Sequence, residues 1–273
     1  MPFGNALSDS LGKLDSMLSD PRTSVEDFTR IIEIEPVIAG RVMKWANGAL
    51  YGSGRAEVTT LKMAVGRLGL YLVRDLVYSV TLPRLFTKSA VLNHRQFWKH
   101  SLAVAIYARL LCRKNQTSEQ ESDLAYMAGL MHDVGVLVFA AIIPTQYSKF
   151  IETCQTTGKL LEEREEAEFG ISHQELGAIF MTRWWSIPFN VAAAVKQHHA
   201  NFDELESPPR GALVVKVSNS VVNSQHIHNG TSCYSESFSE MDWLRMGLTL
   251  EDTESIIKEV EIALEEAEEL LTG

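Results

Sequence analysis

Apolar residues recur at spacings of three and four along most of this chain, and runs in which apolar and polar residues alternate are scarce. The first spacing places apolar side chains on one face of an α-helix, whereas alternation is typical of a half-buried strand. A chain with this pattern along most of its length buries its apolar surface by packing helices against one another. The sequence therefore predicts an all-α protein.

Two capping boxes mark the starts of helices within this pattern. Thr23-Ser24-Val25-Glu26 has the spacing of the first box and predicts a helix that ends at Pro36. Ser172-His173-Gln174-Glu175 has the spacing of the second box and predicts a helix that runs toward Trp185. In a capping box the first hydroxyl accepts a hydrogen bond from a backbone N–H of the first turn, so that the sequence itself indicates where the helix begins.

Glycines, prolines and polar stretches divide the remaining segments. Gly69 predicts a break within the helical residues 60–82, and Pro83 predicts the end of that segment. The polar residues 114–123 predict a loop. Residues 134–143 are compatible with a buried strand or a helix, and we favour a helix because their neighbours are helical. Helices are also predicted over residues 37–50, 97–113, 124–132, 147–168 and 250–271, with Glu162, Glu163, Glu165 and Glu166 on a solvated face.

The composition is that of a folded, acidic protein. Of the 273 residues, 45% are hydrophobic, and 25 Lys and Arg residues against 35 Asp and Glu residues give a formal net charge of −10. Proteins that bind nucleic acid or anionic membranes need a basic face, so this charge argues against both classes. Cys112, Cys154 and Cys233 lack the spacing of a disulfide framework or a metal site, and we expect buried or free thiols in a reducing compartment.

The sequence has no segment with the pattern of a targeting or membrane element. The N-terminal residues lack a basic stretch followed by an apolar one, so they do not resemble a secretory signal. The most apolar run, residues 124–143, carries His132 and Asp133, which a membrane-spanning helix rarely holds at its centre. We therefore expect a cytoplasmic protein.

Histidines are the best candidates for chemistry in this chain. Three of them belong to the adjacent pairs His132-Asp133 and His198-His199, which close apolar helical runs. Imidazole and carboxylate are ligand types that suit iron, zinc, nickel or manganese. A metal site and a metal-free cluster of hydrogen-bonded side chains both remain open, because spacing alone does not bring the segments together. The candidate residues are His100, His132, Asp133, His173, His198 and His199.

Other motifs with known chemistry are absent from the sequence. It contains no GxxxxGK[ST] phosphate-binding loop, no HExxH zinc-binding pair and no GxSxG nucleophile elbow. The remaining histidines, His94, His226 and His228, lie in polar stretches, and we expect them at the surface.

Several short motifs resemble a known family. The segment Ala128-Gly129-Leu130-Met131-His132-Asp133-Val134-Gly135 resembles the GLLHDIG signature of the HD superfamily. The order of the other motifs resembles the HDOD family, an HD-related output domain of bacterial signalling proteins. This resemblance covers roughly residues 12–205 and rests on residues 31–36, 41–52, 64–69, 98–101, 169–177, 185–188 and 198–199.

The resemblance implies an all-α fold in which an N-terminal helical lobe packs on an HD-like helical core. We place the lobe at residues 1–90, the core at residues 91–205, and a C-terminal helical extension that completes the core at residues 206–273. Catalytic HD relatives of the HD-GYP type bind metal at positions that correspond to the six candidates. The resemblance therefore implies a metal site formed by His100, His132, Asp133, His173, His198 and His199.

Three departures from the catalytic pattern concern hydrolysis. The closing aspartate of the superfamily is expected within residues 213–222, where Asn219 is the best match. Val136 stands where catalytic relatives have a lysine, and the GYP motif is absent from residues 201–209. Hydrolysis of a phosphoester needs metal ions and positive charge beside the phosphoryl oxygens, so the loss of a carboxylate ligand and of a lysine weakens both.

Two functions are compatible with these residues. The one we favour is a non-catalytic signalling module that keeps a degenerate metal site, with one ion in it, and acts by binding a signalling protein or a small ligand. The alternative is a metal-dependent phosphohydrolase. We expect the input to come from another protein. The apolar face of residues 250–271 has two interpretations as well: it docks on the body of the protein, which we favour, or it binds a partner or a second copy in a homodimer.

Overall fold

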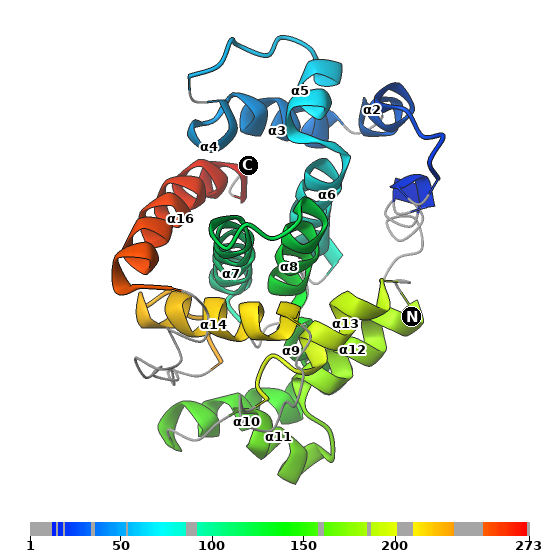
Figure 1. Cartoon of the computed structure of the whole chain (residues 1–273). Helices are drawn as coiled ribbons and strands as arrows, with labels where there is room; N and C mark the ends of the chain where they lie inside the picture. Colours follow the sequence, from blue (N-terminus) through cyan, green and yellow to red (C-terminus); the bar gives the residue numbers. More distant parts are fainter. Residues whose placement is uncertain are drawn as a thin grey trace. The chain divides into compact units, whose positions relative to one another are not determined.

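The structure, a computed structural model, describes residues 13–14, 16–18, 20–33, 36–52, 54–85, 92–157, 161–184, 187–200, 210–231 and 248–271. Within these residues every regular element is an α-helix and no strand is present, which confirms the all-α prediction. The helices, which are labelled in Figure 1, belong to two compact units. One unit comprises Met1–Leu85 and Glu261–Gly273, and the other comprises Phe86–Val260.

The first unit contains a series of short helices. Asn47 fixes the loop that precedes α5, because its side-chain amide donates to the carbonyl oxygen of Val58 (2.9 Å) while its side-chain oxygen accepts from the N–H of Val58 (2.8 Å). Phe28, Ile32 and Val42 are among its buried apolar side chains. The helices are α2 (Val25–Glu33), α3 (Pro36–Asn47), α4 (Ala49–Gly52), α5 (Leu61–Leu68), α6 (Leu70–Leu85) and the end of α16 (Leu250–Leu271).

Two predicted helix boundaries are wrong in this unit. Ser24 rather than Thr23 caps α2, since its hydroxyl accepts from the N–H of Asp27 (3.1 Å) and the Asp27 carboxylate accepts from the N–H of Ser24 (3.2 Å). α6 continues past Pro83, where we predicted its end. Pro83 lies in the last turn of the helix, so the hydrogen bond that its missing N–H removes lies at the helix end, where few residues follow. Gly69, with a φ of 81°, separates α5 from α6 as predicted.

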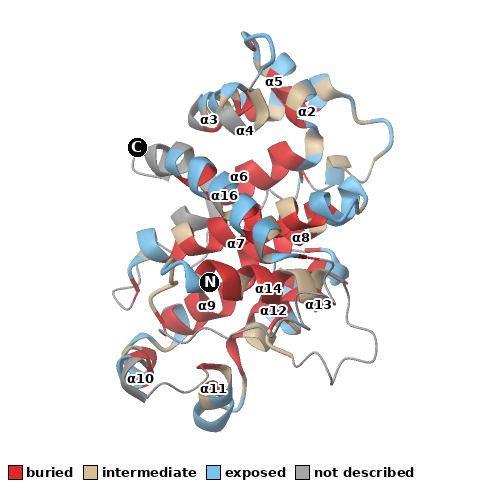
Figure 2. Ribbon diagram, turned by 60° about the vertical axis from the view of Figure 1, so that its left-hand side comes forward, coloured by how far each residue is buried: buried red, intermediate tan, exposed pale blue. Residues whose placement is uncertain are grey.

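The second unit is built around α7 (His94–Lys114) and α8 (Glu119–Met131), which pack against each other. Gly129 allows this close approach, because a Cβ atom at that position would lie 2.9 Å from the Cα of Ala105. α14 (Arg210–Ser224) contacts both helices, and α9 (Val134–Ile142) packs on α12 (His173–Trp184). These helices are largely buried (Figure 2).

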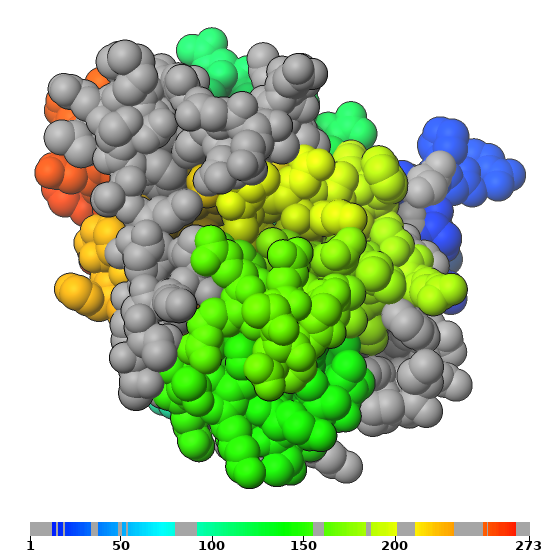
Figure 3. All heavy atoms as spheres, turned by 90° about the horizontal axis from the view of Figure 1, so that it is seen from below, coloured from blue at the N-terminus to red at the C-terminus, as the bar shows by residue number. Residues whose placement is uncertain are grey.

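The remaining helices of this unit extend from that core. α13 (Phe189–Lys196) contacts α8, α12 and α14. α10 (Pro144–Thr157) and α11 (Leu161–Phe169) follow α9, and residues of this green to yellow-green part of the chain occupy the lower centre of the view in Figure 3. The prediction that residues 134–143 are helical rather than extended is confirmed by α9.

The loop between α7 and α8 is shorter than predicted. α8 begins at Glu119, and Ser118 is its N-cap. The Ser118 hydroxyl accepts from the N–H of Glu121 (3.2 Å), and the Glu121 carboxylate accepts from the N–H of Ser118 (3.0 Å). The predicted loop over residues 114–123 is therefore wrong in its second half. The S-x-x-E spacing that marks this start was present in the sequence.

One segment of the described residues, Glu119–Ile142, is long and apolar enough to cross a membrane by length and composition alone. It comprises α8, a turn and α9, and 89% of its most apolar window is buried inside the protein. Burial of this kind is what a helix in a protein core shows. Cys112 and Cys154 are buried free thiols, as expected, while Cys233 lies outside the described residues.

Candidate metal centre

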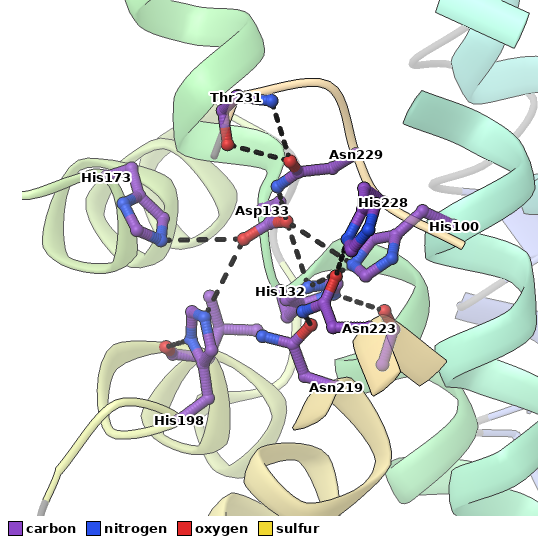
Figure 4. A network of polar contacts seen from close by, with 12 residues as sticks. His100, His132, Asp133, His173, His198, Asn219, Asn223, His228, Asn229 and Thr231 are labelled. Atoms are coloured by element: carbon purple, nitrogen blue, oxygen red, sulfur yellow. Dashed lines mark hydrogen bonds and ion pairs between the residues drawn. The ribbon is translucent and has the colours of Figure 1, made fainter. Parts of the chain in front are cut away.

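The turn between α8 and α9 lies at the centre of a cluster of histidines (Figure 4). His132 and Asp133 occupy this turn. Gly135 lets the start of α9 approach the start of α12, because a Cβ atom there would overlap the backbone carbonyl of His173. The structure thus brings together all six candidate residues: His100 from α7, His132 and Asp133 from the turn, His173 from α12, and His198 and His199 from the turn after α13.

Asp133 lies between two groups of imidazole nitrogens. Its Oδ1 atom is 3.4 Å from Nε2 of His173 and 3.7 Å from Nε2 of His198. Its Oδ2 atom is 3.0 Å from Nε2 of His132 and 3.8 Å from Nε2 of His100. The potential ligand atoms therefore form two sets that share Asp133: one of Asp133, His173, His198 and His199, and one of His100, His132 and Asp133.

The outward-facing Nδ1 atoms fix the tautomers of these rings. Each of three Nδ1 atoms lies 2.7 Å from a backbone carbonyl oxygen: His100 from that of Ile227, His132 from that of Gly129, and His198 from that of Val195. Because a carbonyl oxygen can only accept, each Nδ1 carries the hydrogen, and the inward-facing Nε2 of the neutral ring keeps its lone pair. His173 donates from Nδ1 to the carboxylate of Glu165 at 2.6 Å. Histidines that bind metal are held in this way by an outer partner.

The inward-facing atoms are spaced like the ligands of a metal ion. With bonds of about 2.1 Å, neighbouring ligand atoms of a tetrahedral or octahedral ion lie about 3.0–3.4 Å apart. Nε2 of His100 is 3.3 Å from Nε2 of His132, and Nε2 of His199 is 3.2 Å from Nε2 of His173. The lone pairs of His100 and His132 face each other and repel unless a cation lies near them. The buried Nε2 of His198 has no hydrogen-bond partner among the described residues. The residues present therefore fit a transition metal.

Burial and neighbouring charge set the protonation of the cluster. Loss of hydration lowers the pKa of His100 and that of His198 to about 4 each, so both rings are neutral near pH 7. Burial also lowers the pKa of His173, but the adjacent carboxylates outweigh it and hold that pKa well above its usual range. Burial raises the pKa of Asp133, but the surrounding histidines hold it well below its usual range. An ionised carboxylate beside the neutral imidazoles of His100 and His198 is a combination that binds metal, whereas His173 has to release its proton before it can act as a ligand.

Five of the six candidate residues are inaccessible to solvent. The exposed fraction is 0% for His100 and His132, 1% for His173 and His198, and 3% for Asp133. His199 is the exception: its side chain is 23% exposed, and its Nδ1 lies 3.3 Å from a carboxylate oxygen of Glu162. Of the candidate residues, His199 is thus the one that solvent reaches.

Glu165 belongs to the site although the sequence predicts it on a solvated face, and that prediction is wrong. Glu165 is fully buried. One of its oxygens accepts from the hydroxyl of Tyr147 (2.6 Å), and the other accepts from both the backbone N–H and Nδ1 of His173 (2.6 Å each). Three donors stabilise the buried carboxylate. Glu163 and Glu166 are exposed, as predicted.

The loop after α14 supplies another contact that the sequence did not indicate. The side-chain amide of Asn229 donates to Oδ2 of Asp133 at 2.6 Å. Asn219, which stands where the closing aspartate is expected, is half-buried and accepts from the side-chain amide of Asn223 at 2.9 Å. Figure 4 shows Asn219 and Asn223 beside the histidine cluster.

The histidines that we expected at the surface differ in exposure. His226 is exposed, while His94 and His228 are half-buried. His228 donates from Nδ1 to the side-chain oxygen of Asn223 at 3.3 Å. None of the three belongs to the sets of potential metal ligands found among the described residues.

Comparison with known proteins identifies sequence relatives. A family model described as the HDOD domain matches residues 5–201. An uncharacterized protein of Treponema pallidum (strain Nichols) is 23% identical over 193 residues, which cover 71% of this chain and 37% of that protein. The chain therefore spans about 37% of the length of this curated relative.

Three solved structures share the fold. An HDOD domain protein of unknown function from Geobacter sulfurreducens is 22% identical with a TM-score of 0.76, over 96% of this chain and 90% of that one. A protein from Shewanella amazonensis SB2B, provisionally named a phosphohydrolase, is 19% identical with a TM-score of 0.75, over 96% and 93%. A protein from Marinobacter aquaeolei VT8, provisionally named a signal transduction protein, is 21% identical with a TM-score of 0.73, over 97% of this chain and 59% of that one.

Proposed function

The chain belongs to the HDOD family, and from this premise we propose that it is a regulatory signalling module with a metal ion in its buried histidine–aspartate site. The ion is held by His100, His132, Asp133 and some of His173, His198 and His199. In this proposal the module acts by binding a signalling protein or a small ligand, and it hydrolyses phosphoesters poorly or not at all.

The burial of the ligands carries this proposal. A catalytic metal site keeps a position open for water or substrate, whereas a structural site is closed by its protein ligands. Here five of the six candidate residues are at most 3% exposed, and only His199 among them is accessible. Among the candidate residues, a substrate phosphoryl group would therefore meet a solvent-accessible side chain only at His199.

The charge of the site also favours a regulatory role. Asp133 is the one carboxylate among the potential ligands that the described residues offer, and Asn219 is neutral at the position of the closing aspartate. Val136 is fully buried where catalytic relatives have a lysine. Stabilisation of the charge on a phosphoryl group being transferred needs cations, and this site offers few.

The ligand atoms indicate a class of metal ions rather than one particular metal. Imidazole nitrogens with a single carboxylate suit iron, zinc, nickel or manganese better than magnesium or calcium, which prefer oxygen ligands. When bound, such an ion would act as a Lewis acid and would tie α7, α12 and the turn before α9 together. The residues of this chain orient that site through the outer partners of their Nδ1 atoms.

A metal-dependent phosphohydrolase is the second candidate, and one observation favours it. Asp133 presents one oxygen to each of the two sets of histidines. A carboxylate shared in this way is compatible with two ions, and pairs of ions catalyse phosphoryl transfer in many enzymes. Asp133 alone provides little negative charge to balance two dications, which is why we rank this function second.

The proposal also covers the cellular location of the module and the kind of partner that it binds. We place it in the cytoplasm, with a signalling protein, a small ligand or a second copy of the chain as its partner. We do not expect nucleic acid or a membrane surface as a partner, because the net charge is −10.

A screen for hydrolysis separates the two functions. The metal-loaded protein is tested against phosphomonoesters, phosphodiesters and cyclic dinucleotides, with the His132→Ala variant as the control for contaminating enzymes. We expect the same background rate for both proteins. Brisk turnover that depends on His132 would establish the phosphohydrolase and overturn the regulatory proposal.

A further inference from the structure

The loop after α14 touches the metal site at two points. The carbonyl oxygen of Ile227 accepts from Nδ1 of His100 at 2.7 Å, and the amide of Asn229 donates to Oδ2 of Asp133 at 2.6 Å. Asn229 lies 96 residues after Asp133 in the chain. Figure 4 shows its side chain directed at the carboxylate from the side opposite to His198.

Thr231 fixes the direction of the Asn229 amide. Its backbone N–H and its hydroxyl both donate to the side-chain oxygen of Asn229, at 2.9 Å and 2.7 Å. Because a backbone N–H can only donate, the oxygen of the amide must face Thr231 and the NH₂ group must face Asp133. Gly230, with a φ of 88°, makes the turn that brings Thr231 back to Asn229. Thr231 is 1% exposed and Asn229 is half-buried.

We infer that Asn229 is a positioning residue of the metal site, that Thr231 orients it, and that the pair sets the metal affinity by holding the Asp133 carboxylate between the two sets of histidines. This inference rests on the proposed function, because it presumes that the site binds a transition metal. Without this contact, the Asp133 carboxylate would be held only by the histidines that face it, and these are the residues that have to turn toward the ion.

The chemistry of an amide suits this role. A lysine or arginine at position 229 would hold the carboxylate but cancel its charge, whereas a neutral NH₂ group orients Asp133 and leaves the negative charge for the cation. That charge matters more in this chain because Asn219 supplies none. Outer partners of metal ligands typically contribute a factor of about 10–100 to metal affinity.

The test measures the Zn²⁺ and Mn²⁺ affinities of the metal-stripped full chain by competition with a fluorescent chelator. Asn229→Leu keeps most of the side-chain volume and removes the donor, and it should raise Kd about 10–100-fold. Thr231→Val removes one of the two groups that orient the amide and should raise Kd by a smaller factor. Thr231→Ser keeps the hydroxyl and should bind like the wild type.

Asn223→Leu is the matched control. Asn223 is a half-buried amide in the same region, but its side chain contacts Asn219 and His228 rather than Asp133. It should leave Kd within about twofold of the wild-type value, because it changes no outer partner of a ligand. The visible spectrum of the Co²⁺-loaded proteins reports ligand geometry independently, and it should change for Asn229→Leu and not for Asn223→Leu.

The outcomes separate the inference from the proposed function. Equal Kd values and equal Co²⁺ spectra for the wild type and Asn229→Leu would overturn the inference and leave the metal site in place. A wild type that binds neither metal would overturn the proposed function and the inference with it. If Asn229→Leu does not fold, as judged by thermal unfolding without metal, the Thr231→Val and Thr231→Ser pair decides, and equal affinities for those two would overturn the inference.

Discussion

Buried carboxylates organise the candidate site at the scale of single residues. Asp133 gathers the inward-facing nitrogens, and Glu165 holds one of the rings from outside. Both are acceptors with no donor of their own when ionised, so each depends on the donors that surround it. A change of one atom in either side chain should therefore be measurable.

Replacement of Glu165 by glutamine tests the outer partner. An NH₂ group on the side of His173 would face two N–H donors, and one on the side of Tyr147 would force that hydroxyl to accept instead of donate; in either orientation the negative charge beside the His173 ring is lost. We expect Glu165→Gln to lower the free energy of unfolding of the metal-stripped protein by about 1–3 kcal/mol, as measured by urea denaturation. Glu166→Gln, at an exposed position of the same helix, should stay within about 0.5 kcal/mol of the wild type. Equal effects of the two substitutions would contradict the role of Glu165.

Gly135 tests the close approach of α9 to α12. A Cβ atom at this position would overlap the carbonyl of His173, so Gly135→Ala must push the two helices apart. We expect a loss of about 1–3 kcal/mol in the free energy of unfolding and a marked loss of bound metal. Gly66→Ala is the control: it meets no atom within 4 Å in the exposed part of α5 and should stabilise the protein by about 0.5–1 kcal/mol. An unchanged free energy of unfolding and unchanged metal content in Gly135→Ala would show that the close approach of α9 to α12 is not needed.

The sequence could predict the six candidate residues but not the residues that hold them. The candidate ligands lie in short motifs, and the resemblance of these motifs to a known family predicted them. The burial of Glu165 was not predicted because its neighbours Glu163 and Glu166 are exposed. The one signal in the sequence is its spacing of four from the buried Leu161, which places both residues on the inner face of α11. The contact of Asn229 was not predicted because its partner, Asp133, is distant in the chain, and no local sequence pattern indicates such a contact.

At the scale of secondary-structure elements, the positions of the helix ends determine where the candidate metal ligands lie. α8 begins at a capping box, runs through the core and delivers His132 and Asp133 at its end. α9 and α12 begin at the site, and α14 passes beside it into the loop that carries Asn229. The positions of these ends therefore fix the positions of the ligands.

The N-cap of α8 can be tested alone. Ser118→Ala removes the hydroxyl that accepts from the N–H of Glu121. We expect the free energy of unfolding to fall by about 1 kcal/mol, as measured by thermal and urea denaturation. Ser118→Asp, which keeps an acceptor at this position, should restore the stability. An alanine variant as stable as the wild type would contradict the importance of this cap.

The stability of the protein should depend on pH because Tyr107 is buried in α7, near the place where the first part of α16 contacts that helix. Lys114 of α7 lies 2.7 Å from the carboxylate of Asp252, and Tyr107 of α7 is fully buried. Burial raises the pKa of Tyr107 from 10.0 to about 12. The folded protein therefore holds this proton more tightly than the unfolded chain, so the contribution to stability is complete below pH 10 and disappears as the pH rises through 12.

Comparison with Tyr107→Phe isolates this effect. Between pH 8 and pH 11 the wild type should lose about 1 kcal/mol more of its free energy of unfolding than Tyr107→Phe does, because only the wild type carries the hydroxyl. Urea denaturation at the two pH values measures the difference. Identical losses for the two proteins would contradict the shifted pKa.

At the scale of the whole molecule, periodicity was enough to predict an all-α fold, and the order of motifs was enough to predict the family. The domain boundaries at residues 90 and 205 stay predictions. The start of α2, the continuation of α6 past Pro83 and the early start of α8 were misjudged, because each depends on the hydrogen bonds of one or two residues rather than on periodicity. The resemblance implied that these histidines form one site, but only the structure shows that Asp133 lies between two sets of them.

The central claim is that these segments converge in order to hold a metal ion. The most direct test is the metal content of the purified full chain, measured by elemental analysis for the wild type, His132→Ala and His198→Ala. The exposed His226→Ala variant serves as the control. We predict about one transition-metal ion per chain in the wild type and in His226→Ala, as expected when a single ion needs about four protein ligands, and clearly less in His132→Ala and His198→Ala. Equal and near-zero metal in all four proteins would contradict the account.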